Sequence, residues 1–323
     1  MNRKSQSDRS VGRPRVRLLE VSERSDGQRL DNFLMRECPG VPKTRLYRAI
    51  RKGEIRVDKG RSKAERRLKA GQIVRLPPLE VAERMPATAP QGWQRRLESA
   101  VLLEDELILA INKPPGLAVH GGSGLSYGLI ETLRSMRSDW KRIELVHRLD
   151  RDTSGVLLLA KKPRALRDLH ELFRSREGVR KSYLTLVHGK WPKSKGIVDA
   201  PLERFERKSG ERMVVVSSQG KASLTSFTLE RQFPNATLLR AIPVTGRTHQ
   251  IRVHTAHSGH PILGDVKYAS KQSEMLSADL KLKRLFLHSS ELEFRLSGRA
   301  YHLQAALDDE LEATLDIACK IMN

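Results

Sequence analysis

The sequence predicts an α+β protein, with a mixed, mainly antiparallel sheet in a larger domain and a small domain before it. The 323 residues exceed the roughly 150 residues of one typical domain, so two domains are expected. Apolar runs with strand character do not alternate strictly with helical patterns, which argues against a doubly wound parallel sheet. Four prolines fall within 77–98, and we assign residues 81–98 as a linker between the domains.

Composition argues against several classes of protein. No run approaches the ~20 consecutive apolar residues of a membrane helix. The basic N-terminus is followed by no apolar segment of the kind found in secretory signals. Cys38 and Cys319 lie too far apart in sequence to suggest a disulfide framework or a spaced metal site. We therefore expect a soluble, cytoplasmic protein.

The N-terminal part is expected to hold a basic, disordered tail over 1–20 and a folded module over 21–80. Apolar residues at i, i+3 and i+4 predict two short helices, separated by Pro39 and Gly40. Apolar residues that alternate with charged ones predict short strands after them. The helical positions are Leu30, Phe33 and Leu34, then Leu46, Ala49 and Ile50; the strand positions are Ile55 and Val57, then Ile73, Val74 and Leu76.

The larger domain, over 99–323, begins with two apolar runs around an acidic turn at 101–114, which is typical of a β-hairpin. Other segments have the length and apolar pattern of strands or helices. The predicted strands are Val156–Ala160, Tyr183–Val187, Met213–Val216, Ser223–Leu229 and Thr237–Ile242; the predicted helices are Leu129–Met136, Ala165–Phe173, His249–Thr255 and Leu311–Ile321.

The chain is strongly basic. Its 60 Lys and Arg against 38 Asp and Glu give a formal charge of +22, and residues 1–80 hold 22 basic and 10 acidic residues, a net of +12. Because Lys and Arg gain affinity for phosphates by releasing condensed counterions, this charge predicts a nucleic-acid partner. The alternative is a basic face that is only solvated. The candidate RNA contacts recur at helical spacing: Lys43, Arg45, Arg48, Arg51 and Lys52.

Charged residues crowd the segment 146–155, directly before a predicted strand. Charges beside a buried strand are costly unless they are paired or used. Asp150 lies between Arg148 and Arg151, and guanidinium groups near a carboxylate favour its ionised form, which suits a nucleophile better than a general acid. The alternative is a structural ion-pair loop in which Asp152 caps nearby amides. Spacing alone does not choose between Asp150 and Asp152.

A second cluster places Lys181 and Tyr183 on one side of a predicted strand. Tyrosine can stack on a base or take part in proton transfer, and the alternative is a half-buried core residue.

The third cluster covers 246–254, where Thr248 is expected to cap a helix that carries basic groups. Histidines at 249, 254, 257 and 260 raise the possibility of a metal site. Their spacing fits no common ligand motif and no carboxylate stands at a matching position, so we predict no metal.

These segments resemble two known families. Residues 21–80 are similar to an S4-type RNA-binding domain, with Thr44 and the turn Asp58–Gly60 as departures from its pattern; the matching segments are Arg29–Asp31, Lys43–Arg45, Arg51–Val57 and Lys69–Gly71. The larger domain resembles the pseudouridine synthase family that modifies ribosomal RNA. Its matching segments are Leu109–His120, HRLDRDTSG at 147–155, Lys181–Tyr183, GRTHQIRVH at 246–254, His260–Ile262 with Gly264 and Asp265, and Leu285–His288.

This resemblance implies a pseudouridine synthase fold and an isomerase that flips uridines out of large-subunit ribosomal RNA and converts them to pseudouridine. It implies that Asp150, rather than Asp152, is the catalytic aspartate and that Tyr183 and Arg252 are also catalytic. It implies no cofactor and no metal. The partner is then ribosomal RNA or an assembling ribosomal particle, bound by a monomer. The implied substrate contacts are Arg148, Ile251, Lys181 and Arg247.

Two other function classes stay open at this point. A ribosome-assembly factor without catalysis needs only the basic module. A nuclease or glycosidase usually needs metal ligands or two cooperating carboxylates.

Overall fold

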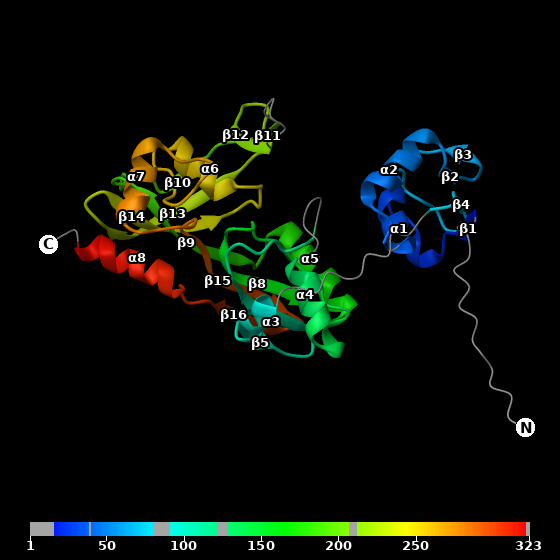
Figure 1. Ribbon diagram of the computed structural model, residues 1–323, viewed down its shortest axis with the longest axis horizontal. Helices are drawn as coiled ribbons and strands as arrows, with labels where there is room; N and C mark the ends of the chain where they lie inside the picture. Colours follow the sequence, from blue (N-terminus) through cyan, green and yellow to red (C-terminus); the bar gives the residue numbers. More distant parts are fainter. Residues whose placement is uncertain (1–15, 39, 80–90, 122–127, 207–211, 321–323) are drawn as a thin grey trace, which may run out of the picture. The chain divides into compact units, whose positions relative to one another are not determined.

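The structure, a computed structural model, describes residues 16–38, 40–79, 91–121, 128–206 and 212–320. The chain divides into two units, Met1–Pro86 and Ala87–Asn323, and each unit has a hydrophobic core of its own (Figure 1). In the described part of the chain, every helix is too short or too polar to cross a bilayer.

The N-terminal unit combines two helices with a four-stranded antiparallel sheet. Its elements are β1 (Arg17–Glu20), η1 (Glu23–Ser25), α1 (Leu30–Glu37), α2 (Lys43–Lys52), β2 (Arg56–Val57), β3 (Gly60–Arg61) and β4 (Ile73–Leu76). The strand order is β1-β4-β2-β3. All six apolar positions that predict the two helices are buried in this unit's core, so both helices are confirmed.

The predicted end of the disordered tail is wrong, because Arg17–Glu20 form β1 and pair with β4. Leu18 is 67% exposed, so this edge strand buries little apolar surface and leaves no alternation that the sequence could reveal. Its backbone hydrogen bonds to β4 hold it in place. Residues 1–15 lie outside the described residues.

The larger unit is built on a ten-stranded sheet, around which helices are packed. Its strands are β5 (Val101–Glu104), β6 (Ile108–Lys113), β7 (Glu144–Leu145), β8 (Ser154–Ala160), β9 (Arg180–His188), β10 (Ile197–Asp199), β13 (Leu224–Gln232), β14 (Ala236–Pro243), β15 (Leu287–Leu296) and β16 (Arg299–Gln304), with β11 (Leu202–Glu206) and β12 (Arg212–Val216) in a separate ribbon. Its helices are α3 (Gln91–Glu98), α4 (Leu129–Met136), η2 (Ser138–Trp140), α5 (Pro163–Ser175), α6 (Gln250–His257), α7 (Lys271–Asp279) and α8 (Asp309–Lys320).

The sheet order is β10-β13-β14-β9-β15-β8-β6-β5, with β16 beside β15 and β7 beside β8. The pair β8–β15 is parallel, whereas the other pairs of the described sheet are antiparallel. The predicted fold class is therefore confirmed. The predicted hairpin at 101–114 is β5–β6, and each predicted strand falls on an observed one, with starts that differ by one to three residues.

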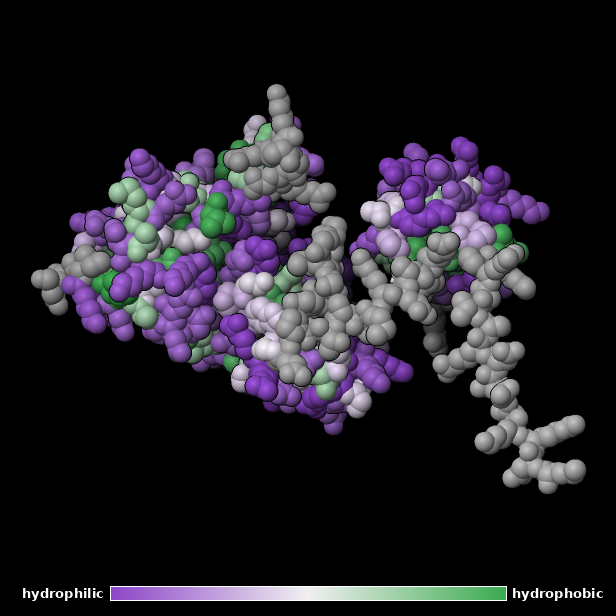
Figure 2. Space-filling model, in the orientation of Figure 1, coloured by the Kyte–Doolittle hydropathy of each residue, from purple (hydrophilic) through white to green (hydrophobic). Residues whose placement is uncertain are grey.

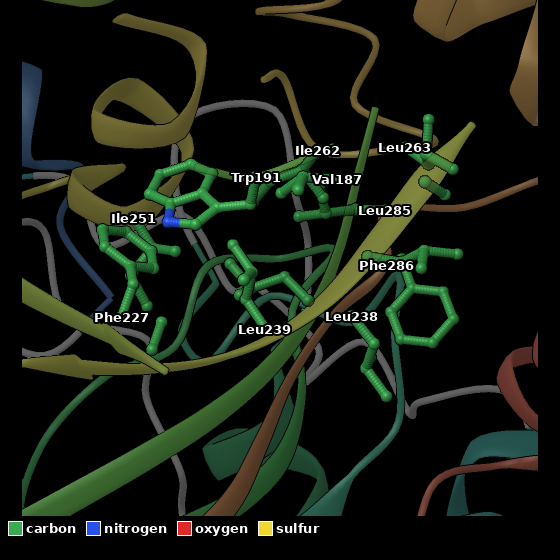
Figure 3. Packing of buried hydrophobic residues seen from close by; sticks show 14 of the residues in the cluster. Val187, Trp191, Phe227, Leu238, Leu239, Ile251, Ile262, Leu263, Leu285 and Phe286 are labelled. Carbon is green, nitrogen blue, oxygen red and sulfur yellow. The ribbon is translucent and has the colours of Figure 1, made fainter. Parts of the chain in front are cut away.

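Alternating side chains of the central strands build cores on both faces of the sheet. In β8, Val156 and Leu158 pack with α5, whereas Leu157 and Leu159 pack with α4. A further core fills the half of the sheet around β9 and β14, where Trp191, Phe227 and Ile251 lie together (Figure 3). Ile251 thereby anchors α6 to the sheet.

The predicted linker 81–98 is wrong over its last eight residues, which form α3. Leu97 is fully buried and packs in the same core as α4. A helix this short is marginal by itself, so tertiary burial of its apolar side chains stabilises it. That burial cannot be read from local pattern. Residues 80–90 lie outside the described residues.

Gly155 fixes the position of the loop that precedes β8. Its φ is +107°, and a Cβ at this position would overlap the backbone of Ser289 on β15. Glycine thus permits the close parallel pairing of β8 with β15. The charged loop at 146–153 is held at that end of β8.

Candidate active site

A cavity of about 300 Å³ opens in the larger unit where three segments meet. They are the loop 146–153 before β8, the start of β9 and the connection 243–252 from β14 into α6. All seven residues predicted as catalytic or substrate-binding line it: Asp150, Tyr183, Arg252, Arg148, Ile251, Lys181 and Arg247. The fold thus brings these seven side chains to one cavity, and the chemical role of each stays a prediction.

Asp150 has partners other than its neighbours in sequence. Arg151, which is next to Asp150 in sequence, pairs with Asp152 instead: its Nε donates to the Asp152 carboxylate at 3.1 Å. That ion pair also occupies Asp152, which the sequence suggested as a cap for nearby amides. The groups that face Asp150 come from α6 and its N-cap: the Arg252 Nη1 lies 3.9 Å, and the His249 Nε2 3.8 Å, from its Oδ2.

Arg252 is buried and is held by Asp265, a partner that sequence reasoning missed. Its Nε and Nη2 donate to the two carboxylate oxygens of Asp265, each at 2.8 Å. Burial alone would lower the pKa of Arg252, but these hydrogen bonds and the charges of Asp265 and Asp150 raise it. Arg252 therefore stays cationic, with Nη1 directed at Asp150. In the sequence, Asp265 stands out only as part of a segment that resembles the family, and no local pattern indicates its partner.

Tyr183 lies on β9 with its ring against the core and its side chain at the cavity. Burial raises the pKa of Tyr183 to about 12; the charge of Asp150 adds to this effect and the contact with Ser289 opposes it. The phenol is thus protonated near neutral pH. Lys181 lines the cavity on the same side, as the strand period predicts, with its Nζ 6.0 Å from the centre of the Phe173 ring.

The remaining predicted contacts lie around the cavity. Arg148 is exposed at its rim. Arg247 is half-buried, and its Nε donates to the carbonyl of Ala222 at 3.2 Å. Arg247 also lines a second cavity, of about 430 Å³, together with Arg204 and Lys221. A basic surface therefore continues outward from the site.

The start of α6 differs from its prediction. Thr248 does not cap the helix; its Oγ1 accepts a hydrogen bond from Arg204 at 2.9 Å, and His249 occupies the N-cap with φ +54°. Gln250 fixes the turn instead. Its Oε1 accepts from the Thr245 hydroxyl at 2.6 Å and from the Arg247 amide at 3.0 Å.

The four histidines raised as metal candidates have separate surroundings. In the described part of the chain, His254 contacts the Thr225 hydroxyl and the Ala200 carbonyl, His260 contacts the His188 carbonyl, and His257 is exposed. His249 faces Tyr268 and Asp150. These four side chains do not converge on one ligand position.

Lys113, at the end of β6, is a further buried group whose role sequence reasoning missed. Its Nζ donates to the carbonyls of Pro114, Leu117 and Arg151, each at 2.9 Å. Burial lowers the pKa of Lys113 to about 7, and the charges of Asp152 and Asp150 oppose this shift. Its ammonium form matches the three carbonyls with three donors and ties the loop 146–153 to the loop after β6.

In the N-terminal unit, the predicted RNA contacts lie on α2. The upper part of this unit in Figure 2, where Figure 1 places α2 and β3, is largely hydrophilic. Arg45 is partly buried and pairs with Glu54 at 2.7 Å, so its charge is compensated. The other four are exposed: Lys43, Arg48, Arg51 and Lys52.

A family model, sequence relatives and solved structures all show similarity to pseudouridine synthases. A family model described as RNA pseudouridylate synthase matches residues 107–257. Ribosomal large subunit pseudouridine synthase C of Pasteurella multocida is 50% identical over 319 residues, which cover 98% of this chain and 97% of that protein. The protein of the same name from Haemophilus influenzae is 49% identical over 304 residues, covering 93% and 94%.

Among solved structures, human RNA pseudouridylate synthase domain containing 4 is similar with a TM-score of 0.59 and 25% identity. The match covers 71% of this chain and 96% of that one. Human RNA pseudouridylate synthase domain containing 1 gives a TM-score of 0.56, also at 25% identity, and covers 67% and 86%.

Proposed function

The chain belongs to the RNA pseudouridylate synthase family and is an isomerase, and from this premise we propose that it converts uridines of large-subunit ribosomal RNA to pseudouridine in the cavity around Asp150. The relatives over nearly the whole chain are named for the large ribosomal subunit, which supports this substrate. We also propose that it acts as a monomer in the cytoplasm.

One observation carries the assignment of the site. Among the described residues that line the cavity, Asp150 is the one carboxylate, and it lies beside cations and an aromatic ring. A glycosidase usually places two carboxylates around the scissile bond. A single anion next to a stacking surface fits a reaction in which the base is detached, turned and joined again.

The cavity requires a nucleotide that has left the RNA stack. A uridine within folded RNA hides its glycosidic bond, and flipping it out costs a few kcal/mol in lost stacking. Arg148, exposed at the rim, is placed to occupy the space that the base leaves. Arg247 and Lys181 supply positive charge near the phosphates, and Ile251 offers an apolar contact for the uracil ring.

Asp150 acts on the flipped nucleotide, either at C1′ of the ribose or at C6 of the uracil ring. The bond between N1 and C1′ breaks, the uracil turns, and a bond forms between C5 and C1′. The proton on C5 then leaves, while N1 gains one, so no atoms are lost overall. Arg252 keeps Asp150 ionised and oriented.

Tyr183 acts both in stacking and in proton transfer. Its ring stacks on the uracil. Because the phenol is protonated near neutral pH, it can take the C5 proton only while it passes its own proton to another base. Asp150 is the acceptor in this proposal, since its charge is near enough to raise the pKa of Tyr183.

Tyr183→Phe keeps the ring and removes this relay. We expect turnover to fall by roughly 10² or more, the usual contribution of a positioned acid or base, with RNA affinity within a few-fold. Single-turnover release of tritium from C5 of uracil measures it. Equal rates for the two proteins would restrict Tyr183 to stacking.

The N-terminal unit, with its likeness to S4 domains, binds the RNA backbone through α2. Replacing Lys43, Arg48, Arg51 and Lys52 by Gln is expected to weaken RNA binding and to reduce the slope of log affinity against log salt concentration by about 3, because each of the four phosphate contacts contributes about 0.7 to 0.9. Filter binding across a salt series measures both quantities.

The matched control replaces four exposed lysines that do not line the cavity, Lys271, Lys281, Lys283 and Lys320. An unchanged slope in the α2 variant, or an equal change in the control, would contradict the assignment of α2.

The function itself is tested with large-subunit ribosomal RNA carrying tritium on C5 of uracil. We expect tritium release together with pseudouridine at mapped positions and intact RNA strands. Binding without release would instead indicate an assembly factor, and strand cleavage or free uracil would indicate a nuclease or glycosidase.

A further inference from the structure

His249 occupies an unusual backbone position beside the catalytic aspartate. Its φ of +54° lies in the left-handed region, which costs a non-glycine residue about 1 kcal/mol or more. Such strain persists where the surroundings hold the residue in place. Here the side chain has fixed contacts on both of its nitrogens, with Tyr268 on one side and Asp150 on the other.

The hydrogen bonds around Tyr268 favour one tautomer of the neutral His249 ring. The amide of Val214 donates to the Tyr268 hydroxyl oxygen at 3.0 Å, so this oxygen already accepts one hydrogen bond. The hydroxyl lies 2.8 Å from the His249 Nδ1. Its own proton is then best placed on Nδ1, which leaves the ring proton on Nε2.

The Nε2–H faces the same oxygen of Asp150 as Arg252 does. The Asp150 Oδ2 lies 3.8 Å from the His249 Nε2 and 3.9 Å from the Arg252 Nη1, so both donors flank one oxygen. Neither distance is that of a tight hydrogen bond, and catalytic hydrogen bonds often shorten only when substrate binds. The other oxygen, Oδ1, is left for the nucleotide.

We propose that His249 is a positioning residue: Tyr268 fixes its neutral ring as the Nε2–H tautomer, and this N–H together with Arg252 holds Oδ2 of Asp150 so that Oδ1 is presented to the substrate. The proposal rests on the proposed function and adds a residue pair, His249 and Tyr268, to its site. Asp265 helps to hold both Arg252 and Tyr268 in place, since its carboxylate binds the Arg252 guanidinium and accepts a hydrogen bond from the backbone amide of Tyr268 at 3.2 Å.

Burial lowers the pKa of His249 and favours a neutral ring near pH 7. The groups that face it are Asp150, Arg252, Asp265, Lys267 and Tyr268. Burial lowers the pKa of His249, the cations add to this effect, and the two carboxylates oppose it. Burial also raises the pKa of Tyr268, which therefore keeps its proton.

The first test compares His249→Gln with His249→Leu. Both carry the same backbone cost at this position, but Gln retains an N–H donor close to where Nε2 lies. We expect kcat of the Leu variant to fall roughly 10- to 100-fold, as for a lost hydrogen bond to a charged group, with KM unchanged, and the Gln variant to recover most of it. His257→Gln, an exposed change on α6, is the control.

The second test is the pH profile of Tyr268→Phe. Without the hydroxyl the neutral ring can exchange tautomers, so we expect activity a few-fold below wild type at pH 7 to 8. Below the pKa of His249 the ring carries protons on both nitrogens and the donor returns. The ratio of variant to wild-type activity should therefore rise as pH falls from 7 to 5.

A third measurement does not depend on activity. Nitrogen NMR of histidine-labelled protein, with His249→Gln to assign the signal, should show a protonated Nε2 and an unprotonated Nδ1 at pH 7.5. The opposite tautomer, equal kcat losses for Gln and Leu, or a flat activity ratio for Tyr268→Phe would each overturn the proposal. Failure of the wild-type enzyme to form pseudouridine would instead count against the proposed function. The NMR measurement would still report the tautomer of His249 in that case, because it does not depend on activity.

Discussion

Asp150→Asn is expected to reduce formation of pseudouridine by at least roughly 10⁴-fold, because an amide is a poor nucleophile and loss of a nucleophile removes most of the chemical acceleration. The amide has nearly the shape of the carboxylate, so the cavity and its stacking surface persist. RNA affinity should stay within a few-fold of wild type. Single-turnover tritium release at saturating enzyme measures the chemical step, and filter binding measures affinity.

The neighbouring carboxylate supplies the matched control. Asp152 pairs with Arg151 and does not line the cavity, so Asp152→Asn should keep turnover within a few-fold. If Asp150→Asn formed product at the wild-type rate, or if Asp152→Asn were the inactive variant, the assignment of the catalytic aspartate would be wrong.

Asp265→Asn is expected to cost stability as well as activity. It leaves the buried guanidinium of Arg252 without its bidentate anionic partner, and removal of one member of a buried ion pair costs about 3 to 5 kcal/mol in the free energy of unfolding. Activity should fall further than the folded fraction does, because Nη1 of Arg252 loses its aim at Asp150. Urea unfolding and tritium release measure the two effects separately.

A double variant separates stability from positioning. Replacing Arg252 by Met and Asp265 by Asn removes both charges but keeps a side-chain oxygen that can accept from the Tyr268 amide, so much of the lost stability should return while activity does not. The half-exposed pair Arg240–Glu230 is the control: Glu230→Gln should cost less than about 1 kcal/mol. A stable and fully active Asp265→Asn protein would contradict this role for the buried pair.

Local pattern was sufficient for most of the fold. The continuous apolar run Val156–Ala160 predicts a strand that is buried on both faces, and β8 does divide its side chains between two clusters. The spacing of Leu46, Ala49 and Ile50 predicts α2 because one face of a helix must be buried. By contrast, β1 and α3 were missed, since pairing with β4 stabilises one and burial of Leu97 stabilises the other.

The sequence by itself therefore determined the fold class, the order of the main strands and helices, and, through the motif at 147–155, which aspartate to test. Only the tertiary structure decided what surrounds that aspartate. Arg151 is next to Asp150 in the chain but pairs with Asp152, whereas Arg252 on α6 and His249 at its N-cap lie opposite Asp150. The electrostatics of a partly buried carboxylate such as Asp150 depend on distance in space, and the chain path that sets those distances is fixed by the packing of the sheet and its helices.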